Sequence, residues 1–225
     1  HIGETAAAVL GDYKFDIDFN GFLLDAARAE VCLAKLDAYP NVGMYETPFD
    51  LSIDIEGARI LRARSIKALI EHFSDAVWSA NCCDGFVVLG GVSKMLRDAT
   101  LATVRNQPFW LQLVGNGLTT TWAAHLGAVL THASWPAITC INLYSHHLLN
   151  EPVEVISGYQ KVPDGHGLGV EVDEAALPLA ERCGEHLLDD RGHVGSRGLH
   201  GAGQGVATQR AEADGAGRDL RRLRG

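Results

Sequence analysis

Three acidic residues stand at the ends of three consecutive predicted β-strands. They are Asp18, Glu46 and Glu71, and each interval between them is about one strand plus one helix, the length of a βαβ unit. Repetition at this interval places the three carboxylates on the same edge of a parallel sheet. Carboxylate oxygens gathered at one edge are the ligands that a hard divalent cation such as Mg²⁺ requires. The sequence therefore predicts a magnesium site formed by these three residues.

The segments that must position these acids alternate between strand and helix. The expected strands are Lys14–Asp18, Val42–Tyr45, Ile66–Ile70, Gly85–Leu89, Phe109–Leu113 and Ala137–Leu143. The expected helices are Leu23–Leu36, Ile53–Ala63, Asp75–Ala80, a helix that Ser93 caps and that runs through Arg105, and Leu118–Leu130. The strand segments are apolar throughout, as buried parallel strands are.

This alternation favours an α/β fold with a parallel sheet covered by helices. A doubly wound sheet and a (β/α)₈ barrel both fit the pattern. The barrel is favoured because acidic residues recur at strand ends, where barrels carry their chemistry.

Composition limits the classes of partner. The chain has 225 residues with 47% hydrophobic and 21% charged side chains, enough for one domain with its own core. The formal net charge of −9 argues against a nucleic-acid partner. No apolar run reaches the roughly 18 residues that a membrane span requires. The five cysteines are odd in number and lack zinc-ligand spacing, so we expect reduced thiols in a cytoplasmic protein.

The two ends of the sequence differ from its middle. Residues 184–225 are dominated by Gly and Arg and lack aromatic residues, which predicts a disordered tail behind a domain over residues 1–183. The chain begins at His1 rather than Met and shows no signal peptide. We therefore expect that the true beginning is absent.

Four passages together resemble a known family. They are Ile17-Asp18-Phe19-Asn20-Gly21, Tyr45-Glu46-Thr47-Pro48, Leu89-Gly90-Gly91-Val92-Ser93 and Val162-Pro163-Asp164-Gly165-His166-Gly167-Leu168-Gly169-Val170-Glu171. In this order and at these spacings they resemble the barrel domain of the enolase superfamily, in its mandelate racemase and muconate lactonizing enzyme branch. The resemblance covers roughly residues 1–177.

The resemblance implies a partial (β/α)₈ TIM-type barrel that lacks the family's capping domain and first barrel strands. It implies Asp18, Glu46 and Glu71 as ligands of Mg²⁺, with His72 in place of Glu71 if the register shifts by one residue. Asn20 and Gly115 are the candidates for substrate binding. Gly115 begins the passage Gly115-Asn116-Gly117-Leu118-Thr119, which opens a helix and either cradles an anion such as a substrate carboxylate or is a tight loop between strand and helix. Relatives are often symmetric assemblies, so a homo-oligomer is expected.

The residues that would move a proton depart from the family pattern. The second-strand base motif is absent unless His1 is its last residue, and the later positions correspond to Asp84, Gln112 and Asn142. Amide side chains can hydrogen-bond a substrate oxygen but cannot act as base or acid near neutral pH.

Three functions stay open. The first is a Mg²⁺-dependent racemase, cycloisomerase or dehydratase that abstracts a proton next to the carboxylate of a hydroxy or sugar acid. The second is a truncated, catalytically impaired remnant of such an enzyme. The third is an unrelated α/β binding protein, in which the three carboxylates would not converge.

Overall fold

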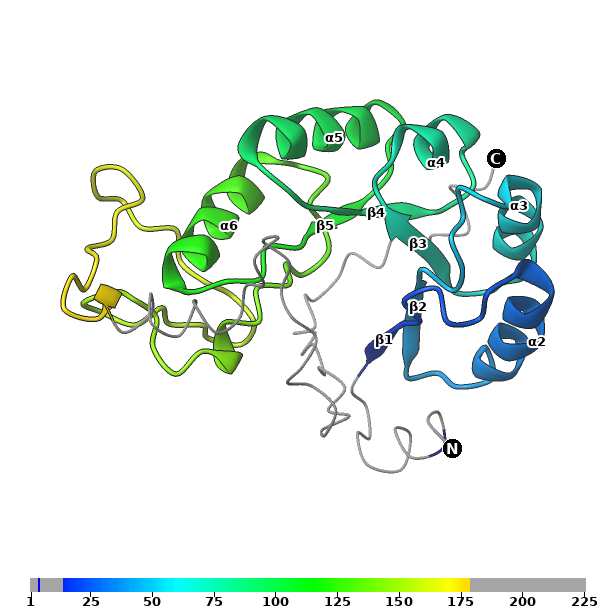
Figure 1. The fold of residues 1–225 in the computed structure, drawn as a ribbon, viewed down its shortest axis with the longest axis horizontal. Coiled ribbons are helices and arrows are strands. Elements are labelled where there is room, and N and C mark those ends of the chain that lie inside the picture. The colour runs from blue at the N-terminus through cyan, green and yellow to red at the C-terminus, as the bar shows by residue number, and fades with distance from the viewer. Residues whose placement is uncertain (1–3, 5–13, 179–225) are drawn as a thin grey trace.

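A computed structural model of the chain describes residue 4 and residues 14–178. Within this part, five parallel strands form one sheet in the order β1-β2-β3-β4-β5. The strands are β1 (Phe15–Asp18), β2 (Val42–Glu46), β3 (Ala68–His72), β4 (Gly85–Val88) and β5 (Phe109–Leu111). The sheet curls into part of a barrel, with helices along its outer side (Figure 1). The expected partial (β/α)₈ architecture is confirmed.

A helix follows each strand. The helices are α2 (Ala26–Leu36), α3 (Ile55–Arg64), α4 (Asp75–Ala80), α5 (Val92–Val104) and α6 (Gly117–Val129). Four of them begin at a residue whose side-chain oxygen accepts a backbone N–H of the first turn: Asp25, Asp54, Ser74 and Asn116. Such caps satisfy donors that a helix start leaves without a partner. The chain therefore encodes where most of its helices start.

The alternation of side chains along the strands divides the core in two. Tyr45, Leu69, Phe86 and Leu111 point outward and are buried against the helices. A separate inner cluster consists of Met44, Ile70, Val87, Trp110 and Trp135, and the rings of the two tryptophans lie 5.8 Å apart. The face that carries this cluster, here called the inner face, is the concave side of the sheet.

Two local expectations are wrong. The segment Ala137–Leu143 is not a sixth strand: only Ile138 bridges to Gln112, and a 3₁₀-helix covers Ile141–Leu143. Cys140 adopts a left-handed conformation (φ 53°), which ends the extended backbone. Ser93 does not cap α5, because Gly91 occupies the cap position and the helix starts at Val92.

Other expectations concern the chain ends, membrane spans and the cysteines. His1, the proposed boundary at residue 183 and the tail 184–225 lie outside the described residues. Within the described part, no helix is long and apolar enough to cross a membrane. Cys32, Cys82, Cys83 and Cys140 are free thiols.

Close packing across the strands makes Gly85 a test of the fold. A Cβ at this position would lie 2.3 Å from Cη2 of Trp135 and 2.4 Å from the carbonyl oxygen of Pro108. We expect Gly85→Ala to lower the free energy of unfolding by about 1–3 kcal/mol, since overpacking forces the strand or the indole to shift. Urea unfolding followed by circular dichroism measures the change.

The matched control is Gly127→Ala. Gly127 is exposed in α6, and a Cβ there meets no atom within 4 Å. This substitution should raise stability by up to about 1 kcal/mol, because Ala is the better helix former. Equal urea midpoints for the two variants would contradict the packing at Gly85.

Candidate metal centre

The register of β1 against β2 brings two of the predicted ligands side by side. Asp18 is paired with Glu46 at the carboxyl ends of these strands. Asp18 is held by Asn20, whose backbone N–H donates to Oδ1 at 2.8 Å and whose amide Nδ2 donates to Oδ2 at 2.7 Å. Asn20 has a left-handed backbone (φ 47°), which turns the chain directly behind the strand. Asn20, which is predicted to bind substrate, thus holds both oxygens of Asp18.

Glu46 is the buried member of this pair. Its exposed fraction is 6%, and it lies on the inner face because it alternates with Met44. Burial, followed by the negative charge of Asp18, raises the pKa of Glu46 to about 7. A buried carboxylate beside a second carboxylate is unfavourable without a cation, and a bound divalent cation would offset that repulsion.

The third strand end presents two adjacent candidates that lie on opposite faces. His72 is paired with Val87 of the inner cluster, whereas Glu71 is paired with Phe86 of the outer core. The ring Nε2 of His72 is 3.8 Å from Oε1 of Glu46. At this edge, therefore, the imidazole and not the Glu71 carboxylate shares a face with Glu46.

Glu71 contacts the same edge from the other side. Its Oε1 accepts from the hydroxyl of Thr47 and from the backbone N–H of His72, both at 2.8 Å, and lies 3.5 Å from Nδ1 of His72. The carboxylate of Glu71, followed by that of Glu46, raises the pKa of His72. Glu71 is 6% exposed, and its Oε2 has no hydrogen-bond partner within the described part of the chain.

A cavity of about 460 Å³ opens at these strand ends. Thr47, Glu71, His72 and the loop residues Asn20 and Asp50 are among those that line it. It combines carboxylates, hydroxyls and one imidazole at the carboxyl edge of the sheet, where (β/α)₈ proteins carry out their chemistry.

The side chains at this edge are of the chemical types that bind a divalent cation. The unpaired Oε2 of Glu71 and the raised pKa of Glu46 both indicate carboxyl groups whose burial is not fully balanced by hydrogen bonds or positive charge. In the described residues, however, no three His, Cys, Asp or Glu side chains are close enough to hold an ion as they stand. Asp18 and Glu46 are paired in the sheet, whereas the side chain of Glu71 starts from the other face.

The residues predicted to handle the proton are not brought together. Gln112 directly follows β5 and alternates with Trp110, which puts it on the inner face; its Oε1 is buried and has no partner among the described atoms. Asp84 precedes β4, at the opposite edge, and is bound to Nε of Arg62 at 2.8 Å and to the backbone N–H of Leu69 at 2.9 Å. Asn142 is exposed in the 3₁₀-helix.

The loop at Gly115 has little capacity to bind an anion. Asn116 accepts the backbone N–H groups of Leu118 and Thr119. The N–H of Gly115 donates to the carbonyl of Thr139, and that of Gly117 donates to the carbonyl of His147. These contacts occupy the donors that would otherwise cradle a carboxylate, so this loop is a tight connection between strand and helix.

Two contributors were not found from the sequence. Thr47 holds Glu71, and its left-handed backbone (φ 41°) turns the chain after Glu46. The sequence feature that could have identified Thr47 is its position between Glu46 and Pro48. Trp110 carries a buried indole N–H without a partner in the described region, on the same face as Glu46. The sequence feature that could have identified Trp110 is the two-residue alternation of side chains within β5.

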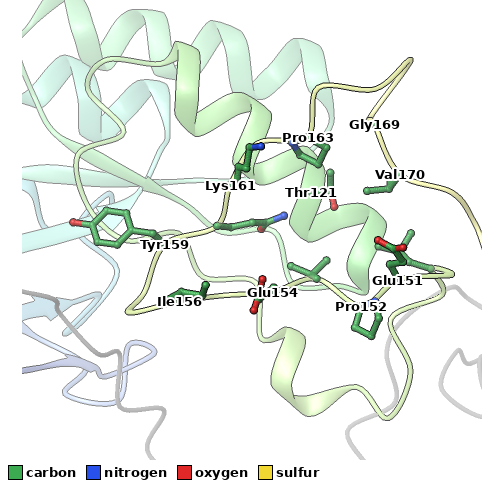
Figure 2. Close-up of a pocket in the computed structure, with 13 residues that line it drawn as sticks. Thr121, Glu151, Pro152, Glu154, Ile156, Tyr159, Lys161, Pro163, Gly169 and Val170 are labelled. Atoms are coloured by element: carbon green, nitrogen blue, oxygen red, sulfur yellow. The ribbon is translucent and has the colours of Figure 1, made fainter.

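The larger cavity lies elsewhere. It measures about 560 Å³ and is lined by Thr121 of α6 and by residues of the segment 149–170 (Figure 2). Glu151, Glu154 and Lys161 line it together with Pro163, and none of the predicted site residues does. Size alone therefore does not identify the functional site.

Comparison with known proteins gives a consistent result. The sequence profile of the family described as enolase C-terminal domain-like matches residues 2–176. The D-galactarolactone cycloisomerase of Agrobacterium fabrum is 26% identical over an alignment of 189 positions, which covers 77% of this chain and 45% of that enzyme.

Solved structures agree in fold. A muconate cycloisomerase from Pseudomonas fluorescens superposes with a TM-score of 0.68 at 22% identity, over 77% of this chain and 51% of that one. A member of the enolase superfamily from Listeria innocua gives a TM-score of 0.63 at 20% identity, over 79% and 50% of the two chains. The chain thus spans about half the length of these relatives.

The raised pKa of Glu46 makes stability depend on pH. Its pKa is about 7 in the folded chain and near 4.5 when unperturbed, so between these values the folded state binds more protons than the unfolded state. The free energy of unfolding of the metal-free protein should therefore fall as pH rises through this window. Glu46→Gln should be more stable than wild type by about 1–3 kcal/mol near pH 8, with a difference that shrinks toward pH 4.5.

Urea titrations in EDTA at several pH values measure this difference. His72 acts in the same direction, because a raised imidazole pKa gives stability that is lost as pH rises, so a smaller slope should remain in the variant. Glu56→Gln is the control, since that side chain is 77% exposed and should change stability by less than about 0.5 kcal/mol. A pH-independent difference between Glu46→Gln and wild type would contradict the assignment.

Proposed function

Because the chain belongs to the family of enolase C-terminal domain-like proteins, we propose that it is a metal-dependent enzyme that removes a proton next to a substrate carboxylate. The observation that carries this proposal is the pairing of Asp18 with the buried Glu46 at the carboxyl edge of the sheet. Family membership also sets aside the hypothesis of an unrelated α/β binding protein.

Asp18 and Glu46 are the proposed ligands of the cation, with Mg²⁺ as the ion that the family implies. A bound Mg²⁺ stabilises the negative charge that develops on the substrate carboxylate when the neighbouring proton leaves. The chain's own contribution is to hold the ligands: Asn20 fixes both oxygens of Asp18, and burial keeps Glu46 poised to release its proton when a cation arrives.

The proposed substrates are hydroxy or sugar acids. Their hydroxyl groups match Gln112, whose buried Oε1 lies on the inner face and can accept a hydrogen bond. The relative from Agrobacterium fabrum is a cycloisomerase that acts on galactarolactone by its name, and the superposed protein from Pseudomonas fluorescens is a muconate cycloisomerase. Both names support the cycloisomerase type over racemase or dehydratase.

A second candidate is a metal-binding protein with impaired catalysis. Two observations favour it: an amide stands at Gln112 on the inner face, and Asp84 is fixed at the opposite edge by Arg62. An amide cannot take or give a proton near neutral pH. The two candidates differ in turnover and agree on cation binding.

Cation binding is tested by thermal unfolding. We expect millimolar Mg²⁺ or Mn²⁺ to raise the melting temperature of the wild type by a few degrees, because a ligand that binds only the folded state stabilises it. Asp18→Asn and Glu46→Gln should lose this increase, whereas Glu56→Gln, an exposed side chain of α3 that does not line the cavity, should keep it. An increase that persists in both site variants would contradict the proposed ligands.

Turnover is tested by exchange of the proton next to the carboxylate. Sugar acids incubated with protein and Mg²⁺ or Mn²⁺ in D₂O should incorporate deuterium at that carbon, as ¹H NMR detects. Asp18→Asn should lower the rate to the uncatalysed level. Cation binding without any exchange would establish the impaired candidate.

A further inference from the structure

The cavity of about 560 Å³ lies between α6 and the segment 149–170, and hydrogen bonds hold this part of the chain to the helix near both ends of the segment. Near its start, the carbonyl oxygen of His147 accepts the backbone N–H of Gly117 at 2.9 Å. Near its end, the carbonyl oxygen of Leu168 lies 3.0 Å from Nε2 of His125. The cavity is therefore a formed part of the structure, and its volume suits a small organic molecule.

The wall that α6 contributes to this cavity carries a hydroxyl group without a partner. Thr121 lies in α6 and is fully buried (0% exposed), and its Oγ1 forms no hydrogen bond within the described part of the chain. Figure 2 shows this oxygen pointing into the cavity. A buried hydroxyl without a partner is unfavourable, so a ligand that hydrogen-bonds Oγ1 would recover the missing interaction.

The charges around the cavity favour a cation. Glu151 and Glu154 line it, and neither carboxylate has a hydrogen-bond or ion-pair partner among the residues that the structure describes. Lys161 also lines the cavity, but it pairs with Asp164 at 3.8 Å, which offsets its charge. The two carboxylates thus leave an excess of negative charge, which attracts a cation and repels an anion.

The apolar part of the lining favours an organic cation over a metal ion. Leu149, Val153 and Val170 contribute side chains that have no atom to coordinate an ion and that suit a carbon skeleton. Across the described residues, no group of three or more His, Cys, Asp or Glu side chains could hold a metal ion. Tyr159 adds an aromatic ring, whose face attracts organic cations.

We propose that this cavity is a second binding site, which takes a small organic ammonium ion. Oγ1 of Thr121 accepts an N–H of the ligand, and the carboxylates of Glu151 and Glu154 offset its charge. The carbon skeleton of the ligand packs on the apolar wall. The cavity shares no lining residue with the one at the strand ends, and the inference does not rest on the proposed function.

Three ligands that share one ring and differ in charge test the chemistry of the site. Benzylammonium, benzyl alcohol and benzoate are titrated into the full chain at pH 7 in EDTA, and saturation-transfer difference NMR measures binding. We expect benzylammonium to bind with a dissociation constant of about 1–10 mM, as ligands with about eight non-hydrogen atoms do. Benzyl alcohol, which lacks the charge, should bind at least about fivefold more weakly, and benzoate should not bind.

Substitution of the two carboxylates locates the site. Glu151 and Glu154 are exposed, so the double variant Glu151→Gln, Glu154→Gln should fold normally and bind benzylammonium about 3- to 20-fold more weakly. The matched control is Glu171→Gln, Glu174→Gln, which removes the same charge from two exposed positions that do not line the cavity. This control should leave binding unchanged.

Replacement of the hydroxyl separates ligand binding from folding. Thr121→Val removes the unpaired oxygen and keeps the shape of the side chain, so thermal unfolding should show a melting temperature no lower than that of the wild type. The same variant should bind benzylammonium about 3- to 10-fold more weakly, because the ligand loses a hydrogen-bond acceptor.

Three results would overturn this inference. The first is no binding of benzylammonium up to about 20 mM, and the second is equal binding of benzylammonium and benzoate. The third is binding that the Glu151→Gln, Glu154→Gln variant leaves unchanged. If Glu46→Gln then abolishes it, the amine binds at the strand ends and not in this cavity.

Discussion

The whole site depends on one constraint, the two-residue alternation of side chains along strands whose parallel register is fixed. This alternation decides that Tyr45 and Leu69 pack on the helices while Met44 and Ile70 form the inner cluster. The same rule, carried to the end of each strand, leaves Glu46 and His72 on the concave side and Glu71 on the other. Hydrophobic burial sets the register, and the polar chemistry at the edge follows from it.

Much of this arrangement follows from local sequence. The helices start at Asp25, Asp54, Ser74 and Asn116 because each supplies an oxygen to the first turn, and the predicted Asp75–Ala80 helix has the observed bounds. The pairing of Asp18 with Glu46 was predictable because equal βαβ intervals bring strand ends to one edge. The partial barrel was predictable for the same reason.

The remaining features depend on single-residue shifts and tertiary contacts that no local pattern contains. A register shift of one residue decides whether Glu71 or His72 faces inward, and only the pairing of β3 with β4 fixes that register. Asp84 has the residue type of a catalytic acid, yet Arg62 and the N–H of Leu69 hold it at the opposite edge. The apolar run Ala137–Leu143 has strand composition, but the left-handed Cys140 and the 3₁₀-turn interrupt it.

The adjacency of Glu71 and His72 has an evolutionary consequence. The strand ends with a carboxylate and an imidazole at neighbouring positions, and the turn at Ser65–Lys67 that leads into β3 is held by the Ser65 hydroxyl and the Lys67 backbone. A one-residue insertion or deletion in that turn would move every β3 side chain to the other face and exchange these two groups. Loop length alone can thus change the chemistry that the inner face presents at its edge, while every residue is kept.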